Sequence, residues 1–305
     1  MIAFFGMGLL GSNFVRALRQ KGEDIRVWNR TAAKAKALEE VGAQAFEDPA
    51  EAVRGAERVH LTLSDDAAVD DVLERAFPGF SKEIVIVDHT TTSPTGTALR
   101  AARWAERGVK FLHAPVFMGP QNALESTGIM LASGDPARVE EVRPALEKMT
   151  GKLAVLGNEP DRAAKFKLFG NLFLMFMTAG VAEVMNLAKA LDVKPEHAGV
   201  LFETFNPGLF LNARVKRMLS AEWDKPSWEL AMARKDARLM LEEGERHDLP
   251  LQMLPAIAAT MDRYIDRGHA HDDWTVIAKD ALTGRHWEDG VRSAEAERSL
   301  APRSP

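Results

Sequence analysis

The fold of this protein is decided by its first residues, MIAFFGMGLLGS (1–12). A short apolar run leads directly into Gly6, Gly8 and Gly11, and an amphipathic segment follows. This order of strand, glycine turn and helix is what a dinucleotide-binding fingerprint requires: a tight turn, close approach of a pyrophosphate, and close helix–strand packing. The alternative is a glycine turn without a ligand. We expect a nucleotide site formed by Gly6, Met7, Gly8, Leu9, Leu10 and Gly11.

Short apolar runs alternate with longer amphipathic segments over the first half of the chain. The runs are predicted strands, at residues 2–5, 25–28, 59–63, 84–87 and 110–113. Such alternation is typical of βαβ units on a parallel sheet. Strand signals then stop, and helical periodicity covers residues 161–191, 195–204, 208–219, 227–246, 250–268 and 273–282.

The predicted fold is therefore α/β, a Rossmann-type doubly wound sheet followed by an all-α C-terminal domain. We expect a nucleotide-binding domain at residues 1–159 and a helical domain at 160–283 that begins with a long interdomain helix. The polar, aperiodic segment 284–305 is a predicted mobile tail.

The composition excludes several classes of protein. The 305 residues carry 39 basic and 44 acidic side chains, a net charge of −5, without the basic stripe that nucleic acid or an anionic membrane would need. Cysteine is absent, which excludes disulfides and a thiolate nucleophile, and the histidines lack metal-ligand spacing. We therefore expect no metal site, no nucleic-acid partner and no membrane partner.

Two further features concern location. The N-terminus lacks the basic and apolar regions of a signal peptide, so we expect a cytoplasmic protein. The most apolar stretch, 168–182, is shorter than the roughly 20 residues that cross a bilayer. We interpret it as a buried helix.

The end of the second predicted strand indicates which dinucleotide binds. NAD is typically held there by a carboxylate on the ribose, whereas arginine pairs with the 2′-phosphate of NADP. Asn29, Arg30 and Thr31 follow this strand, while Glu23 and Asp24 precede it, at the wrong end. Arg30 can stack on adenine and pair with the phosphate, and Thr31 can hydrogen-bond to it. We expect NADP rather than NAD, although Asn29 and Thr31 could also cap the next helix.

A lysine and an asparagine share one face of the helix predicted at 161–191. Residues four apart face the same way, so Lys167 pairs with Asn171 and Gly170 leaves room beside them, whereas Phe169 lies four residues beyond Lys165. Polar groups on so apolar a helix are costly without partners. This distinguishes Lys167 and Asn171 as candidate site residues, the alternative being a lysine that extends to solvent.

Four segments in this order resemble the β-hydroxyacid dehydrogenase family, which includes 3-hydroxyisobutyrate dehydrogenases and glyoxylate or succinic semialdehyde reductases. They are VDHTTTSP (87–94), HAPVFMG (113–119), KFKLFGN (165–171) and the predicted helix at 228–243, with Trp228, Lys235 and Asp236. They are similar to the family patterns D-x-S-T-x-x-P, D-A-P-V-S-G-G, K-x-x-N-N and F-x7-D. The resemblance extends to about residue 283.

The resemblance implies roles for further residues. Thr91 takes a position that contacts cofactor and substrate, Lys235 contacts the nicotinamide half, and Asp236 orients the lysine or contacts substrate. The predicted cofactor set is completed by Asn29, Arg30, Thr31, Leu63, Ser64, Thr91 and Lys235, and the predicted substrate set is Thr91, Phe117, Met118, Gly119, Trp228 and Asp236.

The substrate loop departs from the family pattern. Phe117 and Met118 stand where the family has serine and glycine, and only Gly119 remains; Gly170 likewise replaces an asparagine. Either backbone N–H groups and other side chains hold a substrate carboxylate, or the substrate is more apolar than a small hydroxy acid.

The resemblance implies an NADP-dependent dehydrogenase or reductase acting on CH–OH groups. Hydride passes between the cofactor and the carbonyl carbon of a small β-hydroxy acid or alcohol, Lys167 gives or takes the proton, and Asn171 orients the oxygen. The implied partners are a small-molecule substrate and further copies of the chain, in a homodimer or homotetramer formed through the helical domain.

Other interpretations stay open. Imine reductases share the architecture and the NADP preference, and the apolar loop favours them, but they generally lack the lysine. A 6-phosphogluconate dehydrogenase is disfavoured by the short helical region. A non-catalytic NADP-binding scaffold is disfavoured by the intact Lys167, Asn171 and Lys235.

Overall fold

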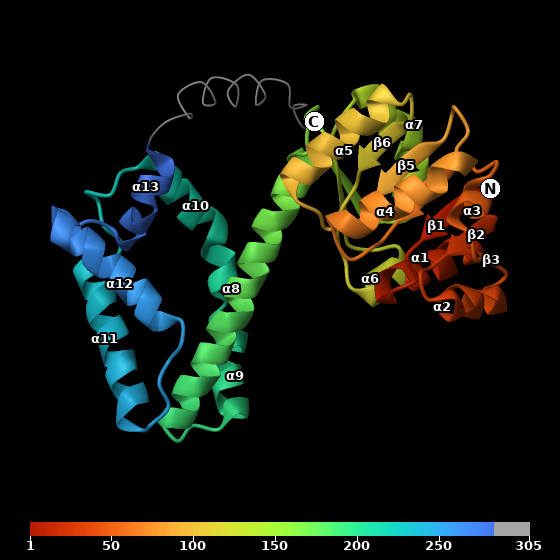
Figure 1. Cartoon of the computed structure of the whole chain (residues 1–305). Helices are drawn as coiled ribbons and strands as arrows, with labels where there is room; N and C mark the ends of the chain where they lie inside the picture. The colour runs from red at the N-terminus through yellow and green to blue at the C-terminus, as the bar shows by residue number, and fades with distance from the viewer. Residues whose placement is uncertain (284–305) are drawn as a thin grey trace, which may run out of the picture. The chain divides into compact units, whose positions relative to one another are not determined.

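The computed structural model describes residues 1–283, so the predicted tail at 284–305 lies outside the described residues. The chain forms two compact units, Met1–Phe173 and a second unit that starts at Leu174. Figure 1 draws the strands of the first unit and the helices of both. The predicted Rossmann-type α/β fold with an all-helical C-terminal region is confirmed.

A six-stranded parallel sheet forms the centre of the first unit, in the order β3-β2-β1-β4-β5-β6. Its strands are β1 (Ile2–Phe5), β2 (Ile25–Trp28), β3 (Gln44–Phe46), β4 (Arg58–Leu61), β5 (Val85–Asp88) and β6 (Lys110–His113). Five of them were predicted to within two residues. The edge strand β3 was missed because it has three residues, none of them buried, and so shows no apolar run.

Helices cover both faces of this sheet (Figure 1). They are α1 (Leu9–Gln20), α2 (Ala32–Lys36), α3 (Pro49–Val53), α4 (Asp66–Ala76) and α5 (Pro94–Glu106), with α6 (Pro120–Glu125) and α7 (Pro136–Glu147) after the last strand. Successive side chains of a strand point to opposite faces, so Phe4 joins one apolar cluster with Phe14, and Phe5 joins another with Trp104. Burial on both faces explains why these strands are continuous apolar runs.

A second, three-stranded sheet was missed entirely by the sequence analysis. It consists of β7 (Val116–Phe117), β8 (Ile129–Ala132) and β9 (Lys152–Val155), with β7 antiparallel to β8. The run IMLA at 129–132 carried a usable signal, since three of its four residues are buried. This sheet matters because β7 holds Phe117, at the start of the predicted substrate loop.

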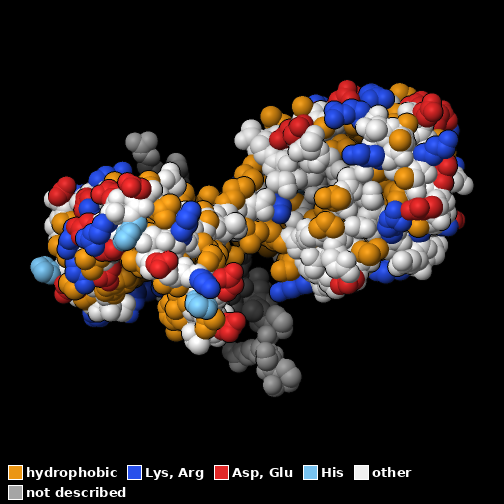
Figure 2. All heavy atoms as spheres, turned by 90° about the horizontal axis from the view of Figure 1, so that it is seen from below, with side chains coloured by type: hydrophobic (Ala, Val, Ile, Leu, Met, Phe, Trp, Pro, Cys, Tyr) orange, Lys and Arg blue, Asp and Glu red, His pale blue; other side chains and the backbone are white. Residues whose placement is uncertain are grey.

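The helix α8 (Arg162–Ala190) has 29 residues and continues from the first unit into the second (Figure 1). The prediction that its apolar stretch is buried is wrong for the chain by itself: Phe169 is 62% exposed and Met175 is 68% exposed. Hydrophobic side chains crowd its surface in Figure 2. By length and composition alone this helix could cross a membrane, but a single helix of this kind is weak evidence for a membrane span.

The second unit is helical over its described residues. After α8 come α9 (Pro195–Thr204), α10 (Leu211–Ser220), α11 (Leu230–Arg246), α12 (Leu254–Tyr264) and α13 (Lys279–Leu282), joined by short 3₁₀ or π turns. A small core holds α11 and α12 together through Leu230, Met261 and Tyr264. Beside it, the buried Asp273 carboxylate accepts hydrogen bonds from Ser227 and Thr275, which lower its pKa to about 2.

Candidate functional site

The glycine turn after β1 has no room for side chains at two of its three glycines. Gly6 has φ +94°, and a Cβ there would overlap the carbonyl oxygen of Thr62, while a Cβ on Gly11 would overlap the carbonyl oxygen of Gly6. Gly8 is different, because a Cβ there would meet nothing within 4 Å. The turn therefore packs tightly on its protein side and is open beside Gly8, as close approach of a ligand requires.

Asn29, at the end of β2, fixes the position of this turn. Its Oδ1 accepts a hydrogen bond from the backbone N–H of Met7 at 2.9 Å, and its Nδ2 donates to the carbonyl oxygen of Thr31 at 2.9 Å. Thr31 precedes α2, but its side chain makes no capping bond. Asn29 thus supports the glycine turn rather than capping the helix.

A cleft at the end of β2 gathers positive charge. Arg30, Lys34 and Arg75 line it, together with the single carboxylate of Asp71. Arg75 also lies over the Trp28 ring, 5.1 Å from its centroid. Lys34 and Arg75 were missed by sequence reasoning, although Lys34 lies one helical turn beyond Arg30. Three cations around one cleft suit a phosphate group, although Arg75 also lies 3.8 Å from the Asp71 carboxylate.

A second cleft, of about 400 Å³, contains most of the predicted site residues of the first unit. It is lined by the turn residues Gly8, Leu9, Leu10 and Gly11, by Thr62, Leu63 and Ser64, by His89, Thr90 and Thr91, and by Val116, Met118 and Lys167. Gly8, Leu63 and Ser64 line both clefts. Segments far apart in the sequence are thus brought to one place, as a dinucleotide and a substrate would need.

Lys167 and Lys165 have opposite environments. Lys165 forms ion pairs with Asp161 at 3.0 Å and Glu159 at 3.3 Å, and these bonds raise its pKa. Lys167 is half-buried in the second cleft, and burial lowers its pKa. The side chain predicted to transfer a proton is therefore the one that gives up its proton more readily. Asn171 lies one turn further along α8 and is half-buried.

In the substrate loop, residues 113–119, Phe117 and Met118 are half-buried, and Gly119 at the start of α6 is exposed. The ring of Phe117 lies against Lys167, with Nζ 4.3 Å from the ring centroid. The Gly119 N–H donates to Oδ1 of Asn122 at 2.9 Å.

The turn after β5 contains hydroxyl groups with separate tasks. Thr90 Oγ1 accepts a hydrogen bond from the Leu63 N–H at 2.9 Å, which joins two walls of the second cleft. Thr92 is buried and bonds to Thr97, and Ser93 caps α5. Thr91 is exposed and lines the cleft, so of these residues it is the one free to meet a ligand there.

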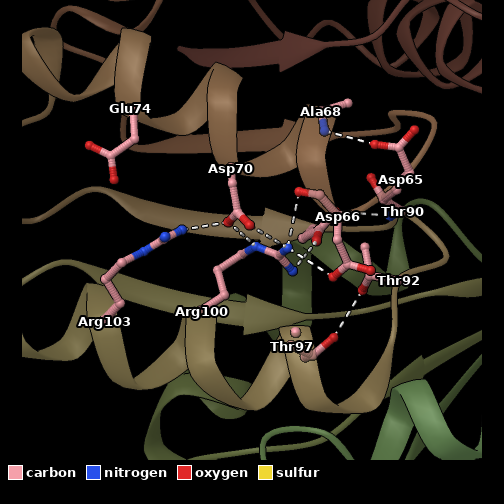
Figure 3. Close-up of polar contacts among 12 residues, drawn as sticks. Asp65, Asp66, Ala68, Asp70, Glu74, Thr90, Thr92, Thr97, Arg100 and Arg103 are labelled. Carbon is pink, nitrogen blue, oxygen red and sulfur yellow. Dashed lines mark hydrogen bonds and ion pairs between the residues drawn. The ribbon is translucent and has the colours of Figure 1, made fainter.

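Beneath this turn, a buried arginine joins α4 to α5 (Figure 3). Arg100 is 1% exposed and bonds to Asp66 at 2.9 Å and Asp70 at 2.8 Å. Asp66 in turn accepts from the Ser93 N–H at 2.8 Å. Charged groups thus fix the start of α5, and with it the hydroxyl-rich turn.

Two buried histidines tie the turn to the substrate loop. His89 Nδ1 lies 2.7 Å from the carbonyl oxygen of Ala114, and His89 Nε2 lies 2.9 Å from Nδ1 of His60. A carbonyl only accepts, so Nδ1 of His89 carries the hydrogen. Burial lowers the pKa of both rings, that of His89 to about 4. Both rings are therefore neutral near pH 7.

The remaining predicted residues belong to the second unit. Trp228 precedes α11, which begins at Leu230 rather than at Trp228 as predicted, and it packs edge-on against Trp274. Lys235 and Asp236 form an ion pair at 2.7 Å. Their contacts with cofactor and substrate stay predictions. Among residues 1–283, no group of three or more His, Asp or Glu side chains could hold a metal ion.

Comparison with known protein families covers nearly all of the described chain. Residues 1–157 match the family model for the NAD binding domain of 6-phosphogluconate dehydrogenase. Residues 162–280 match the one for NAD-binding of NADP-dependent 3-hydroxyisobutyrate dehydrogenase.

Two curated relatives differ in how much of them the chain covers. The 3-sulfolactaldehyde reductase of Escherichia coli (strain K12) is 26% identical over 281 residues, 90% of this chain and 94% of the relative. The cytokine-like nuclear factor N-PAC of Xenopus tropicalis is 30% identical over 262 residues, 84% of this chain. The chain spans about half the length of N-PAC, since the match covers 48% of it.

Solved structures with the same fold include imine reductases. That of Streptomyces aurantiacus has a TM-score of 0.84 at 23% identity, covering 92% of this chain and 99% of the other. That of Myxococcus stipitatus in complex with NADP+ has a TM-score of 0.82 at 19% identity, with the same coverage of 92% and 99%. At such identities the likeness shows the fold.

Proposed function

Because this chain belongs to the β-hydroxyacid dehydrogenase family of NAD(P)-binding oxidoreductases, we propose that it is an NADP(H)-dependent reductase that interconverts a small β-hydroxy acid or alcohol with its aldehyde or ketone. The observation that carries the proposal is Lys167. Its ammonium is half-buried, and it lines the same cleft as the glycine turn.

The residues present fit a dinucleotide. The open space beside Gly8 and the N–H groups at the start of α1 suit a pyrophosphate, and Arg30, Lys34 and Arg75 suit a phosphate on the ribose. When bound, the nicotinamide supplies or accepts a hydride at the carbonyl carbon of the substrate.

Lys167 supplies the proton. As the carbonyl is reduced, negative charge develops on its oxygen, and an ammonium in a half-buried cleft stabilises that charge more strongly than one in water would. The pKa lowered by burial lets the ammonium release its proton to the oxygen, and the neutral amine takes a proton in the reverse direction. Asn171, one turn away on α8, orients the same oxygen.

The preference for NADP rests on the three cations around the first cleft. Loss of one arginine–phosphate contact costs roughly 1.5–3 kcal/mol, so Arg30→Ala should weaken NADP binding by about one to two decades and leave NAD binding nearly unchanged. Titration of both cofactors into both proteins measures this. Equal affinity of the parent protein for NADP and NAD would contradict the preference.

Oxidation of NADPH over a panel of carbonyl compounds tests the activity. The panel contains glyoxylate, semialdehydes and apolar ketones, and 3-sulfolactaldehyde because a relative reduces it. Cyclic imines form a separate arm, because the apolar Phe117 and Met118 beside Lys167 would suit an imine substrate. Turnover of imines alone would identify an imine reductase, and turnover of none would favour a non-catalytic NADP-binding protein.

A second copy of the chain covers α8. Its apolar side chains at 172–177 are exposed at consecutive positions, hence on every side of the helix, so the cover has to surround it. Glu183 argues against a membrane, because its carboxylate accepts hydrogen bonds from the backbone N–H groups of Gln252, Met253 and Leu254 at the start of α12. Those bonds would be lost if the helix left the folded unit.

The second unit also offers a place for a partner side chain. Phe176, Gly180 and Leu187 of α8 line an apolar hollow with Met240 of α11 and Ile257 of α12. One chain thus carries both an exposed apolar helix and an apolar hollow beside it. In two copies related by a twofold axis, the exposed helix of each copy can pack against the hollow of the other, which favours an isologous homodimer.

A further inference from the structure

The ring of Phe117 and the backbone of Gly170 are in direct contact. Phe117 ends β7, and Gly170 lies on α8. A Cβ placed on Gly170 would overlap Cζ of Phe117 and lie 2.5 Å from Cε1. Because these atoms belong to one planar ring, a Cβ at 170 would require the whole ring to move. No side chain at 170 can coexist with the ring in this position.

The same ring covers one side of the Lys167 ammonium. Nζ lies 4.3 Å from the ring centroid, within the range of a cation–π interaction. Burial is the cause that lowers the pKa of Lys167, and no carboxylate of the described residues forms an ion pair with it. The ammonium thus faces an aromatic surface on this side rather than a carboxylate.

The rest of the cleft adds apolar side chains and hydroxyl groups but no further cation. Val116, Met118 and Leu10 line it with Thr62, Ser64, Thr90 and Thr91, and Lys167 is the one lysine or arginine in the lining that the structure describes. Gly128 leaves room for Met118, because a Cβ at 128 would lie 2.9 Å from its Cγ. His89 also lines the cleft but is neutral near pH 7, because burial lowers its pKa to about 4.

This arrangement has a consequence for the substrate. The one cation of the cleft is needed at the reacting oxygen, so the first unit offers a substrate carboxylate no further side-chain cation. Burying a carboxylate without a cation is costly, whereas an apolar substituent gains from contact with Met118, Val116 and Leu10.

We propose that Phe117 and Gly170 form a matched pair that sets the substrate class, with the ring seated on Gly170 so that the site takes neutral carbonyl compounds with an apolar group next to the carbonyl. This inference rests on the proposed function, because it assigns the substrate of the same site. It also decides between the two possibilities that the sequence left open for the substrate loop.

The contact between the Phe117 ring and Gly170 is tested by thermal unfolding, without any substrate. Gly170→Ala alone should lower Tm by at least about 4 °C, because the new Cβ displaces the ring. In the Phe117→Ala background the same change should raise Tm or leave it unchanged, because alanine favours a helix over glycine. Gly180→Ala is the control on the same helix, since a Cβ there meets nothing within 4 Å. It should shift Tm equally in both backgrounds.

The substrate class is tested with two ketones of similar shape, pyruvate and 3-methyl-2-butanone, which differ in a carboxylate against an isopropyl group. Their Kd values are measured on the protein loaded with NADP+, so that no turnover is needed. The parent should bind the neutral ketone at least about tenfold more tightly, and Phe117→Ser should reduce that ratio by at least about tenfold.

Two results would overturn the inference. One is that Gly170→Ala changes Tm equally in the parent protein and in the Phe117→Ala variant. The other is that Phe117→Ser leaves the ratio of the two ketone Kd values unchanged. Absence of any NADPH oxidation would instead count against the proposed reductase function. The binding ratio and the Tm values would still decide whether the pair selects neutral ligands.

Discussion

The first unit buries its apolar side chains within itself, whereas the helices α8, α9 and α10 leave theirs exposed. On the sheet, Phe4 and Phe5 are fully buried on opposite faces. By contrast, α9 and α10 contain no buried residue, and Met175 of α8 is 68% exposed. The difference supports the proposed homodimer, in which a second copy would cover apolar helices that the single chain leaves exposed.

The largest expected effect separates chemistry from cofactor binding within the first unit. Lys167→Ala should lower kcat by a factor of roughly 10²–10⁴, because it removes both the proton donor and the charge facing the oxygen. NADPH binding should persist, because the cofactor clefts are formed by other residues of that unit. Single-turnover hydride transfer and NADPH fluorescence measure the two properties.

Lys165→Ala is the matched control, since Lys165 pairs with surface carboxylates outside the cleft. It should cost less than about tenfold in kcat. Near-normal chemistry in Lys167→Ala with normal NADPH binding would contradict the proposed mechanism.

The next effect tests whether the first unit depends on its own buried network. Arg100→Leu should lower the free energy of unfolding by about 3–5 kcal/mol, because it leaves the buried Asp88 carboxylate without its nearest guanidinium. Arg103→Leu is the control: Arg103 also pairs with Asp70 but is 42% exposed, so about 1 kcal/mol or less is expected. Urea denaturation distinguishes them, and equal losses would show that the burial of Arg100 does not matter.

The histidine pair predicts that the first unit loses stability in acid. The pKa of His89 is lowered from 6.5 to about 4, so between those pH values the unfolded chain binds a proton that the folded chain does not. Stability should therefore be unaffected above pH 6.5 and fall as the pH drops toward 4, by about 3 kcal/mol in total from this group.

Unfolding in urea between about pH 5 and 7.5, a range that includes the ordinary histidine pKa of about 6.5, measures this slope. His89→Gln should flatten the slope by about one proton. His271→Gln, at a side chain that is 88% exposed in the second unit, should leave it unchanged. If stability falls with the same slope in His89→Gln as in the parent protein, His89 is not the group that destabilises the fold in acid.

The smallest expected effect compares two exposed apolar side chains directly. Met175 of α8 is 68% exposed and Leu99 of α5 is 67% exposed. Met175→Asp should raise the dissociation constant of the homodimer by about 100-fold, because it places an unpaired carboxylate in the proposed interface. Leu99→Asp should leave it unchanged. Sedimentation equilibrium measures both dissociation constants. A monomeric parent protein, or equal effects of the two changes, would contradict the proposed homodimer interface on α8.

Prediction from sequence succeeded where the structure depends on residues that are close together in the sequence. The glycine turn was predictable because Gly6 and Gly11 follow a strand directly. The choice of Lys167 over Lys165, made from the spacing to Asn171, stays a prediction. The strands β3 and β7 were not predictable, because three or two residues give no periodic signal.

Contacts between distant segments were the main omission. Arg75 reaches the first cleft from α4, and Phe117 reaches Gly170 from another sheet, so neither could be placed by spacing along the chain. The apolar stretch of α8 was predicted as buried because composition shows that a helix needs cover. Composition does not show whether the cover comes from the same chain.

The seat of Phe117 on Gly170 also constrains the history of this protein. Since a Cβ at 170 would overlap the ring where it now lies, an ancestor with a side chain at 170 held any phenylalanine at 117 in another position. The ring could reach its present place against α8 only with or after the loss of the side chain at 170. Descendants that regain a residue larger than glycine at 170 must displace the ring or replace it, so a change at either position alters what the other can hold.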